Sequence, residues 1–299
     1  MVRLPVVELT PARSNGRTIV LVHGAMHTTA CYLTTPDDRP GWAYAFKKAG
    51  YRTILPDWGR VCPVETPDGW PAAGDLVCRA LGDLLQRIGE PVDLLVHSMA
   101  GPFGFRLLET HGELIRTLVA IAPGPPGNIQ SIPDLLFIDA ERVSVGGSRR
   151  VDAVRHGWLI PTDEFIDRII GDARRFPIGR RSDYRASLAP VRSEFYVERL
   201  NVEGSQLRIE DVAALAGRPV LVMTGTHDRG HSREVDGRVA RWLAGIGACV
   251  EFDYLGDRGI VGNGHMMMLE DNSDELAEAI LLWLSGIDPA SALELKLLS

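Results

Sequence analysis

Ser98 occupies a position from which a serine hydroxyl could attack a carbonyl group. It lies in the run His97-Ser98-Met99-Ala100-Gly101, directly after the apolar segment 92–96. A strand that turns sharply into a helix projects such a hydroxyl, and the helix N-terminus favours the negative charge that develops during acyl transfer. The residues two before and two after the serine must be small. Ala100 meets this requirement, whereas Val96 is bulkier than the glycine that is common there.

Two later loops carry the candidate base and acid. His265, in Gly262-Asn263-Gly264-His265, lies between the last predicted strand and the last predicted helix. The glycines let the backbone bend so that the imidazole turns inward, and His265 is therefore predicted to be the general base. Asp228 follows the strand predicted at 219–223 and is predicted to orient that imidazole and stabilise its charged form. Asp257, on the turn after the next strand, is the alternative acid.

Backbone donors for an oxyanion are predicted on both sides of the serine. The run His23-Gly24-Ala25-Met26 leaves the first strong strand, and Met99 follows the nucleophile. The amides of Met26 or Ala25, together with that of Met99, are expected to form an oxyanion hole. The run His227-Asp228-Arg229-Gly230-His231 contains possible metal ligands, but a loop broken by glycine fixes no ligand geometry. Neither a metal ion nor another cofactor is predicted.

The elements that position these residues alternate between strands and helices. Strands are predicted at 18–22, 52–55, 92–96 and 115–121, with helices at 42–48 and 73–88, as expected for a parallel sheet with crossover helices. Residues 1–125 and 216–299 are predicted to form this α/β core. Between them the strand signal largely vanishes, and residues 126–215 are predicted to form a helical lid or cap. Phe137 and Trp158 lie in apolar stretches of this insert and are predicted to line the substrate pocket, although packing of the lid on the core explains them equally well.

Taken together, these motifs resemble the α/β-hydrolase superfamily, and in particular its esterase-like members with a serine nucleophile. The match rests on the chain order Ser98, Asp228, His265 and on the glycine-containing exit of the first strand. The resemblance implies an α/β-hydrolase fold, with a mostly parallel central sheet, helices on both faces and a lid insert. It also implies a catalytic triad. The nucleophile argues against epoxide hydrolases and dehalogenases of this fold, because they attack with aspartate.

Composition restricts the partners and the cellular location that are expected for this protein. The 299 residues are 45% hydrophobic and 24% charged, which is enough for a large core. The net charge of −7 argues against nucleic acid and anionic membranes as partners, because both need excess Lys and Arg. No apolar run approaches the roughly 18 residues of a membrane span, and the N-terminus lacks the pattern of a secretory signal. The four cysteines form no CxxC pair, which is typical of reduced thiols in a cytoplasmic protein.

The sequence therefore predicts a cofactor-free serine esterase that cleaves a small-molecule carboxylic ester or lactone through an acyl-enzyme on Ser98. The substrate is expected to carry an apolar acyl or alcohol group, and no oligomeric state is predicted. A fold does not set the reaction, so two alternatives stay open. One is a C–C bond hydrolase, lyase or cyclase that uses the same triad. The other is a non-catalytic ligand-binding protein on a hydrolase scaffold.

Overall fold

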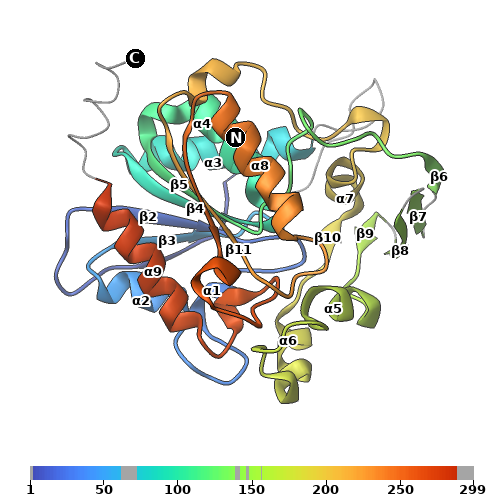
Figure 1. Ribbon diagram of the computed structural model, residues 1–299, viewed down its shortest axis with the longest axis horizontal. Coiled ribbons are helices and arrows are strands. Elements are labelled where there is room, and N and C mark those ends of the chain that lie inside the picture. The colour runs from blue at the N-terminus through green and yellow to red at the C-terminus, as the bar shows by residue number, and fades with distance from the viewer. Residues whose placement is uncertain (1–2, 62–72, 139–141, 146–147, 156, 288–299) are drawn as a thin grey trace.

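The computed structural model describes residues 3–61, 73–138, 142–145, 148–155 and 157–287, and the side chains of 135–155 are not described. Within these residues the core is a seven-stranded sheet in the order β1-β3-β2-β4-β5-β11-β12 (Figure 1). Only the edge strand β1 runs antiparallel to its neighbour, so the sheet is mostly parallel, as predicted. The strands are β1 (Val6–Leu9), β2 (Thr18–Val22), β3 (Arg52–Pro56), β4 (Val92–His97), β5 (Ile115–Ile121), β11 (Pro219–Thr224) and β12 (Cys249–Tyr254).

Helices cover both faces of this sheet, which is why the central strands are almost continuously apolar. Every residue of β2 and β4 is buried. On one face, the Trp42 indole N–H donates to the Ser273 carbonyl at 2.8 Å and joins α2 to α9. On the other face, Phe105 of α4 contacts Trp242 of α8, with 6.3 Å between ring centroids (Figure 1). The helices of the core are α1 (Ala30–Leu33), α2 (Trp42–Lys48), α3 (Ala73–Ile88), α4 (Gly101–His111), α8 (Arg233–Gly245) and α9 (Ser273–Gly286).

The parallel register brings the carboxyl ends of the central strands to one edge. Val22 pairs with Val96, and Ile121 pairs with both His97 and Met223. The loops that follow β2, β4 and β11 therefore leave the sheet side by side. Such an edge is where open α/β sheets bind ligands.

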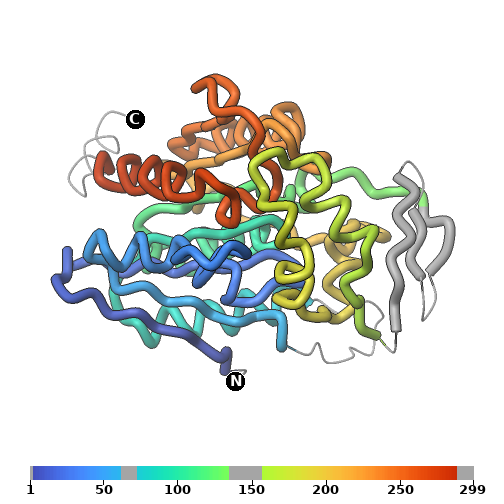
Figure 2. The backbone as a smooth tube through the Cα atoms, turned by 90° about the horizontal axis from the view of Figure 1, so that it is seen from below, coloured from blue at the N-terminus to red at the C-terminus, as the bar shows by residue number. Residues whose placement is uncertain are grey.

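The insert between β5 and β11 lies beyond this end of the sheet rather than over one of its faces (Figures 1 and 2). The insert contains helices, as predicted for a helical lid or cap, but it also contains strands that the sequence did not predict. Among the described residues the insert also forms a five-stranded antiparallel sheet in the order β10-β9-β8-β7-β6. Its elements are β6 (Leu135–Ile138), β7 (Arg142–Val145), β8 (Ser148–Arg155), β9 (Trp158–Leu159), α5 (Asp163–Ile170), α6 (Arg181–Ser187), β10 (Val191–Arg192) and α7 (Ser193–Arg199).

The sequence did not predict these strands, because they show little of the alternation of apolar and polar residues that indicates a strand. Two of them have only two residues, and the longest, SRRVDAVR, is half charged. The pairings β6–β7 and β7–β8 also contain register shifts, which break the alternation expected of a strand.

Two further expectations concern cysteines and membrane spans. Three cysteines lie in the described part of the chain, Cys31 and Cys78 buried and Cys249 exposed, and all three are free thiols. Cys62 lies outside the described residues. Within the described ranges, no helix is both long enough and apolar enough to span a bilayer.

Candidate active site

Ser98 sits at the turn that the sequence predicts. It follows β4 directly and opens a short 3-10 turn, Ser98–Ala100, which leads into α4. Its φ is +54°, in the left-handed region that non-glycine residues rarely adopt. Such a conformation costs on the order of 1–3 kcal/mol and persists only where the surrounding packing enforces it. The strained turn places the Ser98 hydroxyl above the end of the sheet.

Two glycines make room for this turn. A Cβ on Gly104 of α4 would lie 3.0 Å from both γ-carbons of Val96. The helix therefore has a glycine opposite the valine, and the bulk of Val96 is accommodated across the helix–strand contact. A Cβ on Gly24 would lie 2.9 Å from Cβ of Ser98 and 2.8 Å from Nδ1 of His97. The exit of β2 thus runs directly against the serine, which only a residue without a side chain permits.

Ser98, His265 and Asp228 are hydrogen bonded in series. Ser98 Oγ lies 2.8 Å from His265 Nε2, and His265 Nδ1 lies 2.6 Å from Asp228 Oδ2. A carboxylate only accepts, so Nδ1 carries the imidazole hydrogen and Nε2 presents its lone pair to the serine hydroxyl. The His265 and Asp228 side chains are almost completely buried, at 5% and 3% exposure, and water competes little for these bonds. The arrangement can take a proton from Ser98.

The loop around Asp228 stabilises its charge. Burial raises the pKa of this carboxyl group, but the nearby His265 and His231 and the hydrogen bonds to it outweigh burial and lower the pKa to about 2. The backbone N–H groups of Gly230 and His231 donate to Oδ1 at 2.8 and 3.1 Å. The alternative acid, Asp257, lies elsewhere: it is half exposed and forms an ion pair with Arg233 at 2.7 Å.

The residues predicted for the oxyanion hole border the serine on two sides. Met99 is buried in the 3-10 turn immediately after Ser98. Ala25 and Met26 follow Gly24, and Met26 adopts a left-handed φ of +58°. The carbonyl of Met26 accepts a hydrogen bond from the Ala189 N–H of the insert at 3.0 Å. Their role as oxyanion donors stays a prediction.

A buried polar network holds the loop that carries His265, and sequence analysis missed it. The Glu270 carboxylate accepts from the Gly264 N–H at 2.7 Å and from the Asn263 side-chain amide at 2.5 Å. Burial raises the pKa of Glu270 to about 7, although these hydrogen bonds oppose the shift. His97 donates from Nε2 to the His265 carbonyl at 3.0 Å. Burial lowers the pKa of His97 well below its usual value, so this ring is neutral and positions the loop without adding charge.

The insert contacts the same loop from outside. The backbone N–H groups of Arg174 and Arg175 both donate to the Gly262 carbonyl, at 2.8 and 3.3 Å. The Arg175 guanidinium donates to the Val261 carbonyl at 2.8 Å and pairs with Asp271 at 3.1 Å. The segment of the insert before α6 is therefore bound to the core on both sides of the turn that presents His265.

A second contact joins the insert to the loop after β2. His27 lies 2.7 Å from the Ala25 carbonyl through Nδ1 and 2.9 Å from the Tyr184 hydroxyl of α6 through Nε2. Burial lowers the pKa of His27 to about 3, so the ring is neutral. Its Nδ1–H then donates to the carbonyl, and Tyr184 donates to Nε2. Only the fold makes this pairing visible, because 157 residues separate the partners.

Two residues of the insert are predicted to line the substrate pocket. The side chain of Phe137 lies outside the described part of the chain. Trp158 is half-buried within the insert, where the Arg192 guanidinium lies 5.5 Å from the centre of its ring. Trp158 thus packs within the insert, and its place in a substrate pocket stays a prediction.

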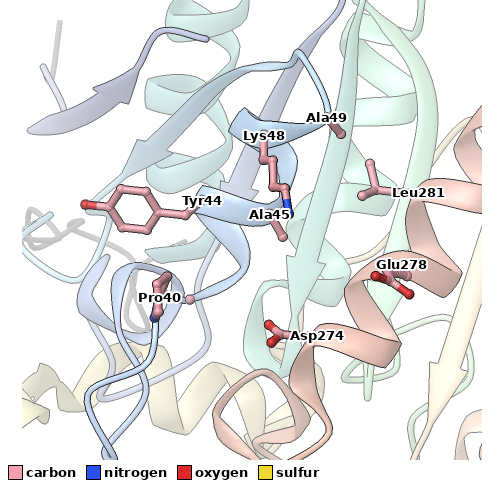
Figure 3. A pocket seen from close by; sticks show the side chains of 9 residues that line it. Pro40, Tyr44, Ala45, Lys48, Ala49, Asp274, Glu278 and Leu281 are labelled. Atoms are coloured by element: carbon pink, nitrogen blue, oxygen red, sulfur yellow. The ribbon is translucent and has the colours of Figure 1, made fainter. Parts of the chain in front are cut away.

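The pockets that lie away from the serine include two of similar volume. One, of about 590 Å³, lies between α2 and α9, and its lining includes Tyr44 and Lys48 of α2 and Asp274 and Glu278 of α9 (Figure 3). The other, of about 580 Å³, lies on the outer side of the Asp228 loop, between residues 171–174 and 226–229. The described residues contain no group of three or more His, Cys, Asp or Glu side chains arranged to hold a metal ion.

Comparison with known proteins identifies the family and the fold. The sequence profile of the alpha/beta hydrolase family matches residues 19–279. The chain is also similar to a probable secreted lipase, phiG, from Fungal sp. (strain ATCC 74256). The two are 27% identical over an alignment that covers 89% of this chain and 81% of the lipase. The description of that relative as secreted leaves the cytoplasmic location of this chain a prediction.

Solved structures show the same fold at low identity. A bacterial esterase is 18% identical, with a TM-score of 0.55 and coverage of 94% of this chain and 84% of the esterase. A putative non-heme bromoperoxidase, BpoC, from Mycobacterium tuberculosis is 14% identical, with a TM-score of 0.62 and coverage of 96% and 97%. At these identities the structures are informative about architecture alone.

Proposed function

The chain belongs to the α/β-hydrolase family of enzymes, and we propose that it hydrolyses a carboxylic ester or lactone of a small molecule through an acyl-enzyme on Ser98. One observation carries the proposal. The hydrogen bonds run without interruption from Ser98 Oγ through His265 to the ionised Asp228. The similarity to a probable lipase supports ester bonds as the target.

In the proposed first step, Ser98 Oγ attacks the ester carbonyl carbon while His265 Nε2 takes the hydroxyl proton. Nε2 is free to do so because Asp228 holds the hydrogen of the ring on Nδ1. The carboxylate also stabilises the imidazolium that results. His265 then returns the proton to the alcohol oxygen as it leaves, and the acyl group stays on Ser98.

The negative charge on the attacked oxygen requires donors that are already in place. We assign these to the backbone amide of Met99 and to that of Met26 or Ala25. Gly24 supports the assignment, because its close approach to Ser98 brings the loop after β2 against the serine. Losing one such donor typically costs about 3–4 kcal/mol of transition-state stabilisation.

Water completes the proposed cycle. His265 removes a proton from a water molecule that attacks the acyl carbonyl, and the proton passes to Ser98 Oγ as the acid is released. Every proton is accounted for by His265, so the scheme calls on no cofactor. Apolar acyl or alcohol groups are the proposed substrates, and Trp158 is proposed to line the pocket that holds them.

Labelling with a fluorophosphonate probe tests the nucleophile directly. Wild-type protein should be labelled at Ser98, whereas Ser98→Ala and His265→Ala should not be labelled at a measurable rate. Ser285→Ala and His111→Ala provide matched controls, since both residues lie outside the site, and they should label like the wild type. A folded wild-type protein that remains unlabelled would refute the assignment and favour a ligand-binding protein.

The bond that is cleaved is tested with a substrate panel. Turnover of p-nitrophenyl esters of graded chain length and of simple lactones is expected, with loss in Ser98→Ala. Labelling at Ser98 combined with turnover of diketone-like substrates but not of esters would instead identify a C–C bond hydrolase that uses the same three residues.

A further inference from the structure

His231 is a buried histidine beside the candidate active site to which the proposed reaction gives no part. It immediately precedes Ser232, the N-cap of α8, and its side chain is 7% exposed. Its Nδ1 lies 2.8 Å from Oδ1 of Asp236, which is completely buried in the first turn of α8. The other oxygen of Asp236 accepts from the Thr224 hydroxyl at 2.6 Å. Thr224 and Asp236 thus fix the orientation of the His231 ring.

The residue contacts both Asp228 and His265. Its backbone N–H donates to Oδ1 of Asp228 at 3.1 Å, while Oδ2 of the same carboxylate accepts from His265. The His231 ring also packs against the His265 ring, with 4.9 Å between centroids and 33° between planes. One residue therefore holds the acid through its backbone and the base through its side chain.

The groups around His231 favour a positive charge on it. Burial disfavours the imidazolium, but the carboxylates of Asp236 and Asp228 outweigh burial and raise the pKa of His231 above its usual value. The other groups that face it are His265 from its loop, His97 from the end of β4 and the Arg199 guanidinium from α7. None of these three favours the charge, so the two carboxylates are responsible for it.

We propose that His231 is a second positioning residue of this site, which holds Asp228 beneath His265 and places a cation beside the base. The cation opposes protonation of His265, so the base stays able to accept the Ser98 proton in more acidic solution. This inference rests on the proposed function of Ser98, His265 and Asp228. It adds a role that a Ser-His-Asp arrangement does not itself require.

The proposal predicts a direction for the pH profile. If protonated His231 disfavours an imidazolium at His265, replacing His231 makes His265 easier to protonate. The acid limb of the pH profile, where kcat/KM falls as pH decreases, then moves to higher pH. Two unit charges 4.9 Å apart interact enough to shift that limb by about 0.6–1.2 pH units, at an effective dielectric constant between about 40 and that of water.

The experiment compares the pH dependence of kcat/KM for a p-nitrophenyl ester in the wild type, His231→Gln and Asp236→Asn. His231→Gln removes the cation, and Asp236→Asn keeps the ring but removes the carboxylate that favours its charge. Both should shift the acid limb upward. His227→Gln is the matched control from the same loop, where the ring contacts Thr226, and it should leave the limb in place.

Two outcomes overturn the inference. One is an acid limb that stays in place in both variants while kcat falls, which identifies His231 as a packing residue. The other is a limb that moves to lower pH. Fluorophosphonate labelling of Ser98 in each protein separates these from failure of the proposed function, in which the wild type itself is not labelled. If His231→Gln does not fold, Asp236→Asn decides alone.

Discussion

Replacing Asp228 by asparagine should disable the base without removing it. The carboxylate accepts the Nδ1 hydrogen of His265 at 2.6 Å. An asparagine of the same shape can turn its NH₂ group toward the ring, and Nδ1 must then accept. The imidazole hydrogen moves to Nε2, which can no longer take the proton of Ser98.

The size of the loss follows from burial and charge. Asp228 is 3% exposed, so water cannot restore the original tautomer. The pKa of Asp228, lowered from 3.8 to about 2, shows that the site already favours the anion before any imidazolium forms. That shift corresponds to about 2 kcal/mol, and the charged imidazolium of the transition state interacts more strongly still. We expect kcat to fall about 10³–10⁴-fold, or about 4–5.5 kcal/mol.

The assay is the turnover of a short p-nitrophenyl ester, together with the rate of fluorophosphonate labelling of Ser98. Asp257→Asn is the matched control, because this half-exposed residue is the other aspartate that follows a late strand. It should retain wild-type kcat within about twofold. The reasoning is refuted if Asp257→Asn loses activity while Asp228→Asn keeps it, or if both variants turn over normally.

Three further predictions concern packing and pH. Gly104→Ala should destabilise the protein by about 1–3 kcal/mol in urea unfolding, because the new methyl group would lie 3.0 Å from the γ-carbons of Val96. Tyr184→Phe should cost about 1–3 kcal/mol and lower kcat/KM, because it leaves buried Nε2 of His27 without a donor beside the oxyanion loop. Glu270 stays protonated in the folded state up to about pH 7 but ionises near 4.5 in the unfolded state, so it reduces stability progressively as pH rises from about 4.5 to about 7. Relative to the wild type, Glu270→Gln should therefore gain stability across that interval.

Each of these has a control within the chain. Gly245→Ala, where a Cβ meets nothing within 4 Å, should not destabilise the protein. Tyr44→Phe, at an exposed tyrosine of α2, should leave both stability and kcat/KM unchanged. Glu278→Gln, on the exposed side of α9, should change the free energy of unfolding by no more than about 0.5 kcal/mol, as is usual for surface substitutions. A control that behaves like its partner variant would contradict the corresponding prediction.

The insert takes part in building the site as well as covering it. Tyr184 and Ala189 are bonded to the loop after β2, and Arg174 and Arg175 to the loop that carries His265. Arg229, next to Asp228, forms an ion pair with Asp172 of the insert. Because three loops of the site depend on these contacts, changes in the insert should affect the chemistry as well as the choice of substrate.

Local sequence determined the core elements. The strands β2 and β5 and the helices α2 and α3 begin and end at the predicted residues. Apolar runs and four-residue spacing report burial, and burial is what forms these elements. The strand–serine–helix order and the glycine-containing loops likewise predicted where Ser98 and His265 would leave the sheet, because parallel strands end at a common edge.

Tertiary structure decided what depends on partners distant in the sequence. Sequence left both Asp228 and Asp257 as candidate acids, and only the packing of the loops brings Asp228 within 2.6 Å of His265. Val96 is bulkier than the glycine that is common at this turn, and only the packing of α4 on β4 places Gly104 opposite it. The Glu270 network and the contact between His231 and His265 carry no periodic signal, because a buried hydrogen bond or ring contact depends on distance in space rather than on spacing along the chain. The short, charged strands of the insert likewise depend on pairing with other strands.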